Sequence, residues 1–231
     1  MNKNTPLVSV LMSVKDDEKN ISNAIESILN QSFTDFEFLI LNDYSQDSTP
    51  EIINKYKKED ERIQIFTNPE NLGLTKSLNK LIDLSSGRYI ARQDSDDISM
   101  KDRLHEQIKF IMSSNFDACT TRAVIRGSTR AIPNLSFYIP KKISIKYKNP
   151  FIHGTLLIKK QVLIDIGKYD ENFYYSQDYK LFKDLISRKY KIKTLNKKLY
   201  KLNMENNISN INSEEQKYYS DCVKRNIKPA Q

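Results

Sequence analysis

Short apolar runs alternate with helically patterned segments along the first hundred residues. The runs are rich in β-branched residues, and they predict strands at 7–14, 36–41, 63–66 and 88–92. The segments between them repeat apolar residues every three to four positions, which predicts helices at 20–29, 48–56 and 72–84. Strands that alternate with helices in this way form βαβ units around a parallel sheet. We therefore expect an α/β fold with a mostly parallel central sheet flanked by helices.

The pattern changes after residue 100. We expect helices at 102–112, 161–166 and 178–188, and strands at 151–158, 190–192 and 199–202. Residues 120–150 look irregular, and the last stretch is polar with the pattern of a loosely held helix. A length of 231 residues suits one large domain. We interpret 1–100 and 101–231 as two halves of that single domain.

Composition excludes several classes of protein. No apolar run approaches the ~20 residues of a membrane-spanning helix. The N-terminal residues predict a first strand better than a signal peptide. The chain has only two cysteines, Cys119 and Cys222, and two histidines, His105 and His153. These numbers exclude a disulfide scaffold and a cysteine-based zinc site, and they indicate a reducing compartment.

Charge is distributed unevenly between the halves. Residues 1–100 hold 11 Lys and Arg against 17 Asp and Glu, a net charge of −6, whereas residues 101–231 hold 26 against 12, a net charge of +14. A basic half of this size suits a nucleic acid, an anionic membrane surface or an anionic substrate. A lysine-rich, solvated surface with no partner is an equally good interpretation of the charge alone.

Several well-known motifs are absent. The chain has no G-x-x-x-x-G-K-S/T, G-x-G-x-x-G, H-E-x-x-H or G-x-S-x-G sequence. This disfavours P-loop enzymes, Rossmann dehydrogenases, zincins and α/β-hydrolases.

Acidic loops follow three of the predicted strands, at 14–18, 42–47 and 93–97. Parallel strands end at one edge of a sheet, and ligands bind there. The strongest signal is Asp94-Ser95-Asp96-Asp97, whose carboxylates repel one another and therefore attract a cation. Carboxylates without neighbouring His or Cys suit Mg²⁺ or Mn²⁺, with phosphate and water oxygens completing the ligand set. The alternative is that these acids cap the helix that follows.

Three single residues also have two interpretations each. Asp43 would bind a nucleobase or ribose, or cap the helix at 48–56. Asp178 would act as a general base, or cap the helix that it opens. His153 lies in an apolar segment, where a histidine is more often a satisfied core residue than a catalyst.

Three blocks of this chain resemble bacterial family 2 glycosyltransferases. The blocks are VSVLMSVKDDEKNISNAIESILNQSFTDFEFLILNDYSQDST, NLGLTKSLNKLIDLSSGRYIARQDSDDISMKDRLHEQIKFI and NPFIHGTLLIKKQVLIDIGKYDENFYYSQDYKLFKDLISRKYKI. The resemblance covers roughly residues 7–205 in order. It implies a GT-A fold and the transfer of a sugar, with inversion, from a nucleotide-diphosphate sugar.

The resemblance also implies roles for individual residues. Asp43 would contact uracil or ribose, Asp94 the ribose region, and Asp96 the Mn²⁺ or Mg²⁺ that bridges the phosphates. Asp178 would be the base, and Gln177 stands where the family has an acid before it.

Further candidates are Val14, Asp16 and Lys76 on the nucleotide side, and His153 and Gln177 on the acceptor side. Lys15 departs from the family, which often has an aromatic residue there.

The expected donor is a nucleotide-diphosphate sugar, with a UDP-sugar as the first choice. The expected acceptor is a glycan or lipid-linked glycan of surface polysaccharide biosynthesis. We expect a cytoplasmic enzyme that associates loosely with the anionic inner membrane through residues 120–230. The first candidates for that contact are the lysine pairs 141–142, 159–160 and 197–198. We expect no nucleic-acid partner, because no nucleic-acid-binding motif occurs.

Two other function classes stay open. A nucleotidyltransferase also uses acids and Mg²⁺ on an α/β sheet, but it usually needs a glycine-rich triphosphate loop, and VKDDEKN has no glycine. A non-catalytic basic binding module is the other alternative.

Overall fold

A single mixed sheet runs through the computed structural model, which describes residues 5–204 and 213–230. Nine strands form it in this part of the chain, in the order β3-β2-β1-β4-β8-β6-β9-β5, with β7 beside β6. The strands are β1 Val8–Val14, β2 Phe36–Asn42, β3 Ile63–Thr67, β4 Tyr89–Arg92, β5 Ile98–Ser99, β6 Ala118–Ile125, β7 Ala131–Ile132, β8 Leu157–Lys159 and β9 Ile192–Leu202.

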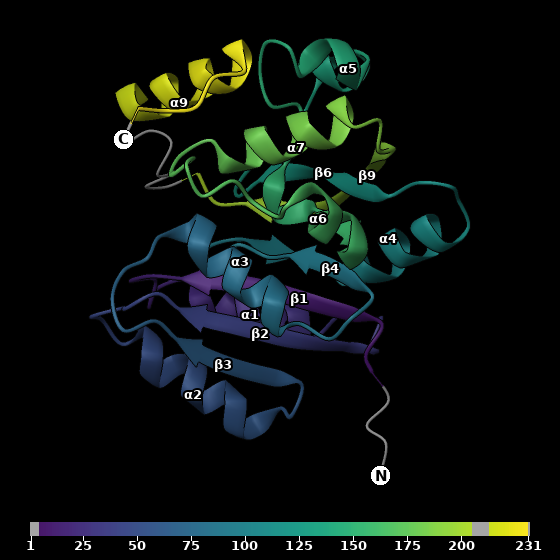
Figure 1. Ribbon diagram of the computed structural model, residues 1–231. Coiled ribbons are helices and arrows are strands. Elements are labelled where there is room, and N and C mark those ends of the chain that lie inside the picture. Colours follow the sequence, from purple (N-terminus) through teal and green to yellow (C-terminus); the bar gives the residue numbers. More distant parts are fainter. Residues whose placement is uncertain (1–4, 205–212, 231) are drawn as a thin grey trace.

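Helices cover both faces of this sheet (Figure 1). The α-helices are α1 Ile21–Leu29, α2 Thr49–Glu59, α3 Leu74–Leu84, α4 Arg103–Met112, α5 Lys141–Ser144, α6 Lys160–Ile166, α7 Gln177–Ser187 and α9 Ser213–Arg225. Two short 3₁₀ helices are η1 Leu135–Phe137 and η2 His153–Thr155. The α/β fold class predicted from the sequence is confirmed.

The first four strands are parallel, as predicted, and their ends are in register. Val14 lies opposite Asn42, and Asn42 lies opposite Thr67. β4 pairs with the other side of β1 in the same direction. The loops that follow these strands therefore emerge at one edge of the sheet, where the sequence predicts the chemistry.

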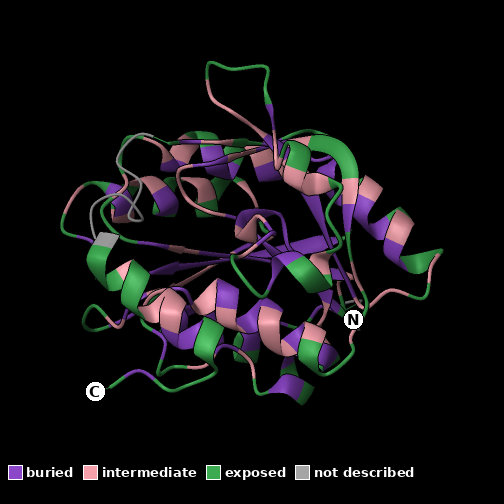
Figure 2. Cartoon of the chain, turned by 90° about the horizontal axis from the view of Figure 1, so that it is seen from above, coloured by how far each residue is buried: buried purple, intermediate pink, exposed green. Residues whose placement is uncertain are grey.

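Alternating side chains of β1 and β2 supply two hydrophobic cores, one on each face of the sheet. Leu11 and Leu39 point to the core that α3, α6 and α7 cover, and Val10 and Phe38 point to the core that α1, α2 and α4 cover. Burial on both faces explains why these strands are continuous apolar runs. Figure 2 shows the buried strands enclosed by helices whose outer turns are exposed.

The second half departs from the parallel pattern. β8 is antiparallel to both of its neighbours, β4 and β6, while β9 runs parallel to β6. The pairing of β4 with β8 joins the two halves into one sheet. In Figure 1 the first half is purple to blue, and the second half is teal through green to yellow. β5 leaves the first half and pairs with β9 at the far edge. Only the first half of the sheet is therefore purely parallel.

Three expectations for the second half are wrong. Residues 118–125 form β6, in a region that looks irregular. Thr120 and Thr121 can be buried there because their hydroxyls bond to the Thr194 hydroxyl and the Arg122 carbonyl. The two short strands expected at 190–192 and 199–202 are one strand, β9. Residues 151–158 are mostly not a strand, since η2 occupies their middle and β8 begins only at Leu157.

The helices of the second half agree better with the sequence-based predictions than its strands do. α6 ends at Gly167, which has a φ of 89°, as the glycine predicts. The expected C-terminal helix is α9, and it packs on α7 with Cys222 and Val223 buried in the core. Both cysteines are free and buried.

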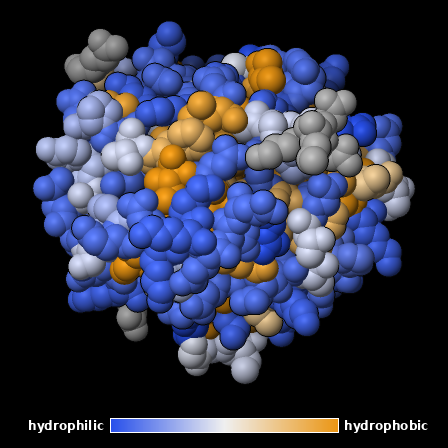
Figure 3. Space-filling view, turned by 90° about the horizontal axis from the view of Figure 1, so that it is seen from below, coloured by the Kyte–Doolittle hydropathy of each residue, from blue (hydrophilic) through white to orange (hydrophobic). Residues whose placement is uncertain are grey.

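The described surface is mostly hydrophilic on the face shown in Figure 3, where hydrophobic side chains occur only in small groups. In the described part of the chain, no helix is both long and apolar enough to cross a bilayer.

Candidate active site

The acidic loop after β4 is held rigidly at the edge of the sheet. Gln93 is fully buried, and its side-chain amide donates to the carbonyls of Asp94, at 2.9 Å, and Asp97, at 3.0 Å. The hydroxyl of Ser99 donates in turn to the Gln93 side-chain oxygen at 2.6 Å. These bonds fix the backbone of the loop that carries the carboxylates.

Asp94 lies against a buried arginine. Arg92 is 1% exposed, forms an ion pair with Asp94, and also donates to the Leu11 carbonyl at 3.0 Å. Gly154 approaches so closely that a Cβ there would lie 2.4 Å from Asp94 Oδ2 and 2.4 Å from the Tyr200 hydroxyl. Only glycine fits at position 154, because any side chain would displace Asp94.

Asp96 lies in an excess of negative charge. Burial is the main cause that raises its pKa to about 6, and the charges of Asp94 and Asp17 add to the effect. Asp17 enters from the loop after β1, where its carboxylate accepts a 2.7 Å hydrogen bond from the Ser95 hydroxyl. Arg126, just after β6, donates to the Asp96 carbonyl at 2.6 Å. This site would be stabilised by a further positive charge.

Asp97 has a different role in the same loop. Its carboxylate accepts the backbone N–H of Asn203 at 2.7 Å, which ties the loop to the end of β9. Burial, together with Asp94 and Asp96, raises the pKa of Asp97 to about 8. Asp97 is therefore a structural acid.

The donor set fits a hard divalent cation. Asp94 and Asp96 offer carboxylate oxygens alone, the ligands that Mg²⁺ and Mn²⁺ prefer. Among the described residues, no three His, Cys, Asp or Glu are grouped to hold a metal by themselves. A cation here would therefore take further oxygens from a substrate or water. The alternative that this loop caps the next helix is wrong, because β5 intervenes and Asp102 is the N-cap of α4.

The loops after β1 and β2 are bonded to each other and form one wall of this edge. Asp16 accepts the N–H of Gln46 at 2.7 Å, and its own N–H donates to the Ser45 hydroxyl at 3.0 Å. Asp16 and Tyr44 adopt left-handed backbone angles, with φ of 49° and 66°. Lys15 pairs with Asp16 at 2.5 Å, which lowers the pKa of that carboxyl.

Asp43 is buried, and its carboxylate is hydrogen-bonded to other groups of the protein. Its carboxylate accepts hydrogen bonds from Asn68 Nδ2 at 2.8 Å, Leu72 N at 2.9 Å and Gly73 N at 2.8 Å. These bonds hold the loop before α3, whereas Ser48 is the N-cap of α2. The interpretation of Asp43 as a cap of α2 is wrong, and a contact with a nucleobase or ribose stays a prediction.

Val14 ends β1, and Lys76 belongs to α3. Val14 is 2% exposed, with its side chain in the core and its carbonyl accepting the Asp43 N–H at 2.8 Å. Lys76 is exposed in the first turn of α3. Contact of either residue with a nucleotide stays a prediction.

Asp178 comes from the other half of the chain, in the first turn of α7. One oxygen accepts the Asn149 side-chain amide at 2.7 Å, and the other accepts the Tyr179 N–H at 2.7 Å. Burial raises the pKa of Asp178, and the charge of Asp94 acts in the same direction. Ser176 is the N-cap, and Gln177 is half-buried beside it at the start of the helix. The two halves thus bring Asp94 and Asp178 into one site.

His153 is half-buried near Arg92. Its Nε2 lies 2.7 Å from the hydroxyl of Tyr169, and burial, followed by the charge of Arg92, lowers its pKa to about 3. The imidazole is neutral at physiological pH, in a position that fits a satisfied structural histidine.

Four residues of the site are not among the sequence-based candidates: Asp17, Arg92, Arg126 and Asn149. Asp17 belongs to the acidic loop 14–18, so that loop already signals it. Arg92 is the last residue of the strand predicted at 88–92. Arg126 and Asn149 lie within residues 120–150, which have no interpretable pattern. These side chains reach the site only through the tertiary fold.

The sequence of this chain is similar to those of known proteins. The model of glycosyl transferase family 2 matches residues 9–191. An uncharacterized glycosyltransferase, MJ1057 of Methanocaldococcus jannaschii, is 34% identical over 93% of this chain and 77% of its own length. The O-antigen biosynthesis glycosyltransferase WbnJ of Escherichia coli is 32% identical over 76% of this chain and 70% of its own.

Solved structures share the fold. The mannosyltransferase PcManGT of Pyrobaculum calidifontis, in complex with GDP-Man and Mn²⁺, has a TM-score of 0.76 at 14% identity, over 99% of this chain and 67% of that chain. S. aureus TarS 1-349, in complex with UDP-GlcNAc, has a TM-score of 0.74 at 22% identity, over 86% of this chain and 58% of that chain. The fold is of the GT-A type, and the chain belongs to glycosyl transferase family 2.

Proposed function

We propose that this glycosyltransferase moves a sugar from a nucleotide-diphosphate sugar, foremost a UDP-sugar, to a hydroxyl group of a glycan or lipid-linked glycan with inversion at the anomeric carbon. One observation carries the proposal. Residues 149–154 lie against both carboxylates, since Asn149 donates to Asp178, in the first turn of α7, and Gly154 packs against Asp94, which follows β4. Such a site would hold an anionic donor and a base together.

The donor is proposed to lie along the edge where β1, β2 and β4 end. Support comes from the solved relatives, since the PcManGT structure holds GDP-Man and the TarS structure holds UDP-GlcNAc. Asp96 would hold Mn²⁺ or Mg²⁺ there, with Asp94 at the ribose region, and PcManGT is in complex with Mn²⁺. When bound, a divalent cation offsets the negative charge that a leaving diphosphate gains.

Asp178 is proposed as the general base. Each carboxylate oxygen accepts one hydrogen bond, which leaves lone pairs for the hydroxyl proton of an acceptor. The acceptor oxygen bonds to the anomeric carbon as the bond to the diphosphate breaks, and the proton passes to Asp178. One base without a second carboxylate nucleophile fits inversion.

The proposed setting is the synthesis of a surface polysaccharide at the inner face of the cytoplasmic membrane. The relative WbnJ is named for O-antigen biosynthesis, which supports such a setting.

The test is incubation of the purified chain with UDP-, GDP- and dTDP-sugars, Mn²⁺ and candidate acceptors. We expect release of a nucleoside diphosphate, and a product whose anomeric proton coupling differs from that of the donor. Retention of the donor's configuration would contradict inversion. Release of pyrophosphate from a nucleoside triphosphate and a sugar phosphate would instead indicate a nucleotidyltransferase.

A further inference from the structure

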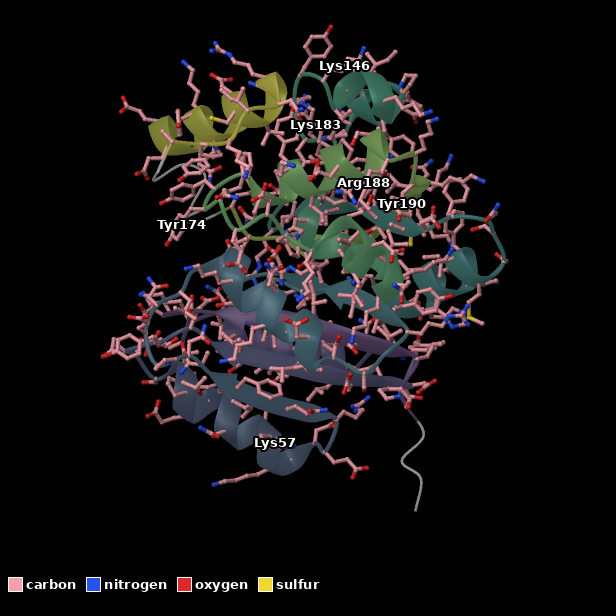
Figure 4. All side chains as sticks on the ribbon, viewed as in Figure 1. Lys57, Lys146, Tyr174, Lys183, Arg188 and Tyr190 are labelled. Atoms are coloured by element: carbon pink, nitrogen blue, oxygen red, sulfur yellow. The ribbon has the colours of Figure 1, made fainter. Side chains whose placement is uncertain are left out.

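Residues 135–148, from η1 through α5, expose an unusual number of large apolar side chains. The exposed fractions are 80% for Leu135, 73% for Tyr138, 71% for Tyr147, 51% for Ile143 and 45% for Ile139. α5 lies at the outer end of the second half, beyond α7, and Lys146 extends from the same end (Figures 1 and 4). We call residues 135–148 the exposed segment.

The exposed segment is anchored to the fold at both ends of α5. Phe137 packs under two cations, with Arg122 at 5.0 Å and Lys141 at 5.3 Å from its ring centroid. Ile145 is 4% exposed, and its carbonyl accepts the Tyr179 hydroxyl at 2.8 Å. Because these contacts fix the backbone, the remaining apolar side chains face outward as part of the folded structure.

The same segment is strongly basic. It contains four lysines, at positions 141, 142, 146 and 148, and no acidic residue. Lys142, Lys146 and Lys148 are exposed. Lysines interspersed with exposed aliphatic and tyrosine side chains are typical of segments that lie in the interface of a membrane.

Charge and composition favour one occupant. The segment has no Asp, Glu, Asn or Gln, whose carboxylate and amide groups bind the hydroxyl groups of a glycan in pairs, and offers only Ser and Tyr hydroxyls. A second copy of the chain would place one set of four lysines against another. An anionic bilayer satisfies both features, because its headgroups attract lysines and its acyl region accepts apolar side chains.

We propose that the exposed segment docks this chain onto the surface of an anionic lipid bilayer. The other lysine pairs expected to contribute are less free to do so. Lys159 pairs with Asp117 at 3.0 Å, Lys160 donates to the Ser85 carbonyl at 2.6 Å, and Lys197 pairs with Glu106 at 2.7 Å. Docking therefore depends on the exposed segment rather than on the basic half as a whole.

The position of the segment links docking to the active site. Asn149 follows it directly and donates to Asp178. Docking would hold the base side of the site at the bilayer, where a lipid-linked acceptor has its hydroxyl groups. This consequence alone rests on the proposed function, whereas docking itself does not.

Vesicle flotation tests the docking. The purified chain is mixed with phosphatidylcholine vesicles, with or without phosphatidylglycerol, and we expect it to float only with the anionic ones and to dissociate at ~0.5 M salt. The variant Lys142→Gln/Lys146→Gln should bind roughly 25-fold more weakly, about fivefold for each lysine. The matched control is Lys55→Gln/Lys58→Gln on α2, near Lys57 at the opposite end of the molecule in Figure 4. It removes the same charge and should float like the wild type.

Insertion of apolar side chains is measured separately. The chain has no tryptophan, so Tyr138→Trp introduces a single indole reporter. We expect its fluorescence to shift to the blue with anionic vesicles, while Met112→Trp, at an exposed position on α4, should not shift. Leu135→Ser/Ile143→Ser should lower vesicle binding at constant charge.

Three results would overturn the docking proposal: equal flotation with neutral and anionic vesicles, equal losses in the two double-lysine variants, or no shift at position 138. Binding of a soluble glycan that quenches the indole of the Tyr138→Trp variant, without any vesicle binding, would assign the segment to an acceptor glycan instead. Activity is followed in parallel through nucleoside diphosphate release with a soluble acceptor, which the segment variants should leave unchanged. An inactive wild type that still floats contradicts the proposed function and leaves docking supported.

Discussion

At Asp96, three influences act on one side chain in the same direction. Burial, the charge of Asp94 and the charge of Asp17 all disfavour its ionised form, in that order. The acids nevertheless stay close together because Gln93 and Arg92 hold the loop from beneath. An electrostatic cost of this kind, kept in a rigid loop at a strand end, indicates a site that is completed by a cation.

We expect Asp96→Asn to remove most of the transferase activity, roughly 10²–10³-fold in kcat/KM, because the amide cannot replace a charged cation ligand. Binding of the nucleotide sugar in the presence of Mn²⁺ should also weaken, as measured by calorimetry. Asp102→Asn is the matched control, since Asp102 is an exposed acid outside the site. Undiminished wild-type activity in excess EDTA would show that no divalent cation is needed.

Asp178→Asn should keep donor binding but lower kcat by roughly 10²–10⁴-fold, the usual contribution of a general base. The side chain keeps its shape but loses one of its two acceptors, so urea denaturation of the variant is measured beside its kinetics. Asp184→Asn on the same helix removes an acid that pairs with Lys180 at 2.5 Å and should change kcat little. If Asp178→Asn transfers sugar within a few-fold of the wild type, the base lies elsewhere.

The acidic limb of the pH profile should report Asp178. Its pKa is raised by burial, and a protonated carboxyl cannot accept a proton, so kcat/KM should fall as the pH drops through that raised pKa. Asn149 donates a hydrogen bond that favours the charged form. Asn149→Ala should therefore move the acidic limb to higher pH. An unchanged limb in this variant would mean that another group controls it.

At the scale of elements, the loop before α3 depends on a side chain that follows β2. Asp43 accepts two backbone N–H groups and one amide from this loop while almost fully buried. These contacts let the end of β2 fix the position of α3. They also explain why an acid stands at a position with little contact with water.

Asp43→Asn should lower the free energy of unfolding by about 1–3 kcal/mol, because the amide leaves a buried donor without its acceptor. Urea denaturation without nucleotide measures this loss. Asp83→Asn, at a mostly exposed acid on α3, should stay within about 0.5 kcal/mol of the wild type. Unchanged stability with lost donor affinity would assign Asp43 directly to the nucleotide.

At the scale of the whole molecule, one sheet connects the first half of the chain with the second half. β4 pairs with β8, and β5 reaches across to β9 at the far edge. The site lies over this junction, since Asp94 comes from one half and Asp178 from the other. Changes in either half would therefore affect the same centre.

We expect the two halves to unfold as one cooperative unit. Native-state hydrogen exchange should give the same largest opening free energy for amides in β1–β4 and in β6, β8 and β9. Two separate limits, or a urea transition in two steps, would contradict the interpretation of residues 1–231 as a single domain.

The sequence by itself determined most of the first half. β1 and β2 are buried on both faces, so each must be apolar throughout most of its length, and α1 and α3 must each carry an apolar stripe. Parallel pairing then forces the acidic loops to one edge. Local pattern and simple geometry were sufficient here. The position of each residue within its own strand or helix sets its burial, and burial sets whether it is apolar or polar.

Only the tertiary structure decided the rest. β6 contains two buried threonines, whose hydroxyls bond to the Thr194 hydroxyl and to the Arg122 carbonyl. Its polar residues therefore make a core strand look like an irregular segment. Asn149 lies 29 positions from Asp178 in the sequence, and Arg92 reaches Asp94 only because the buried strand turns it inward. Partners of this kind are chosen by packing between distant segments. A sequence pattern records which side chains are buried or charged, but the fold alone sets which of them meet.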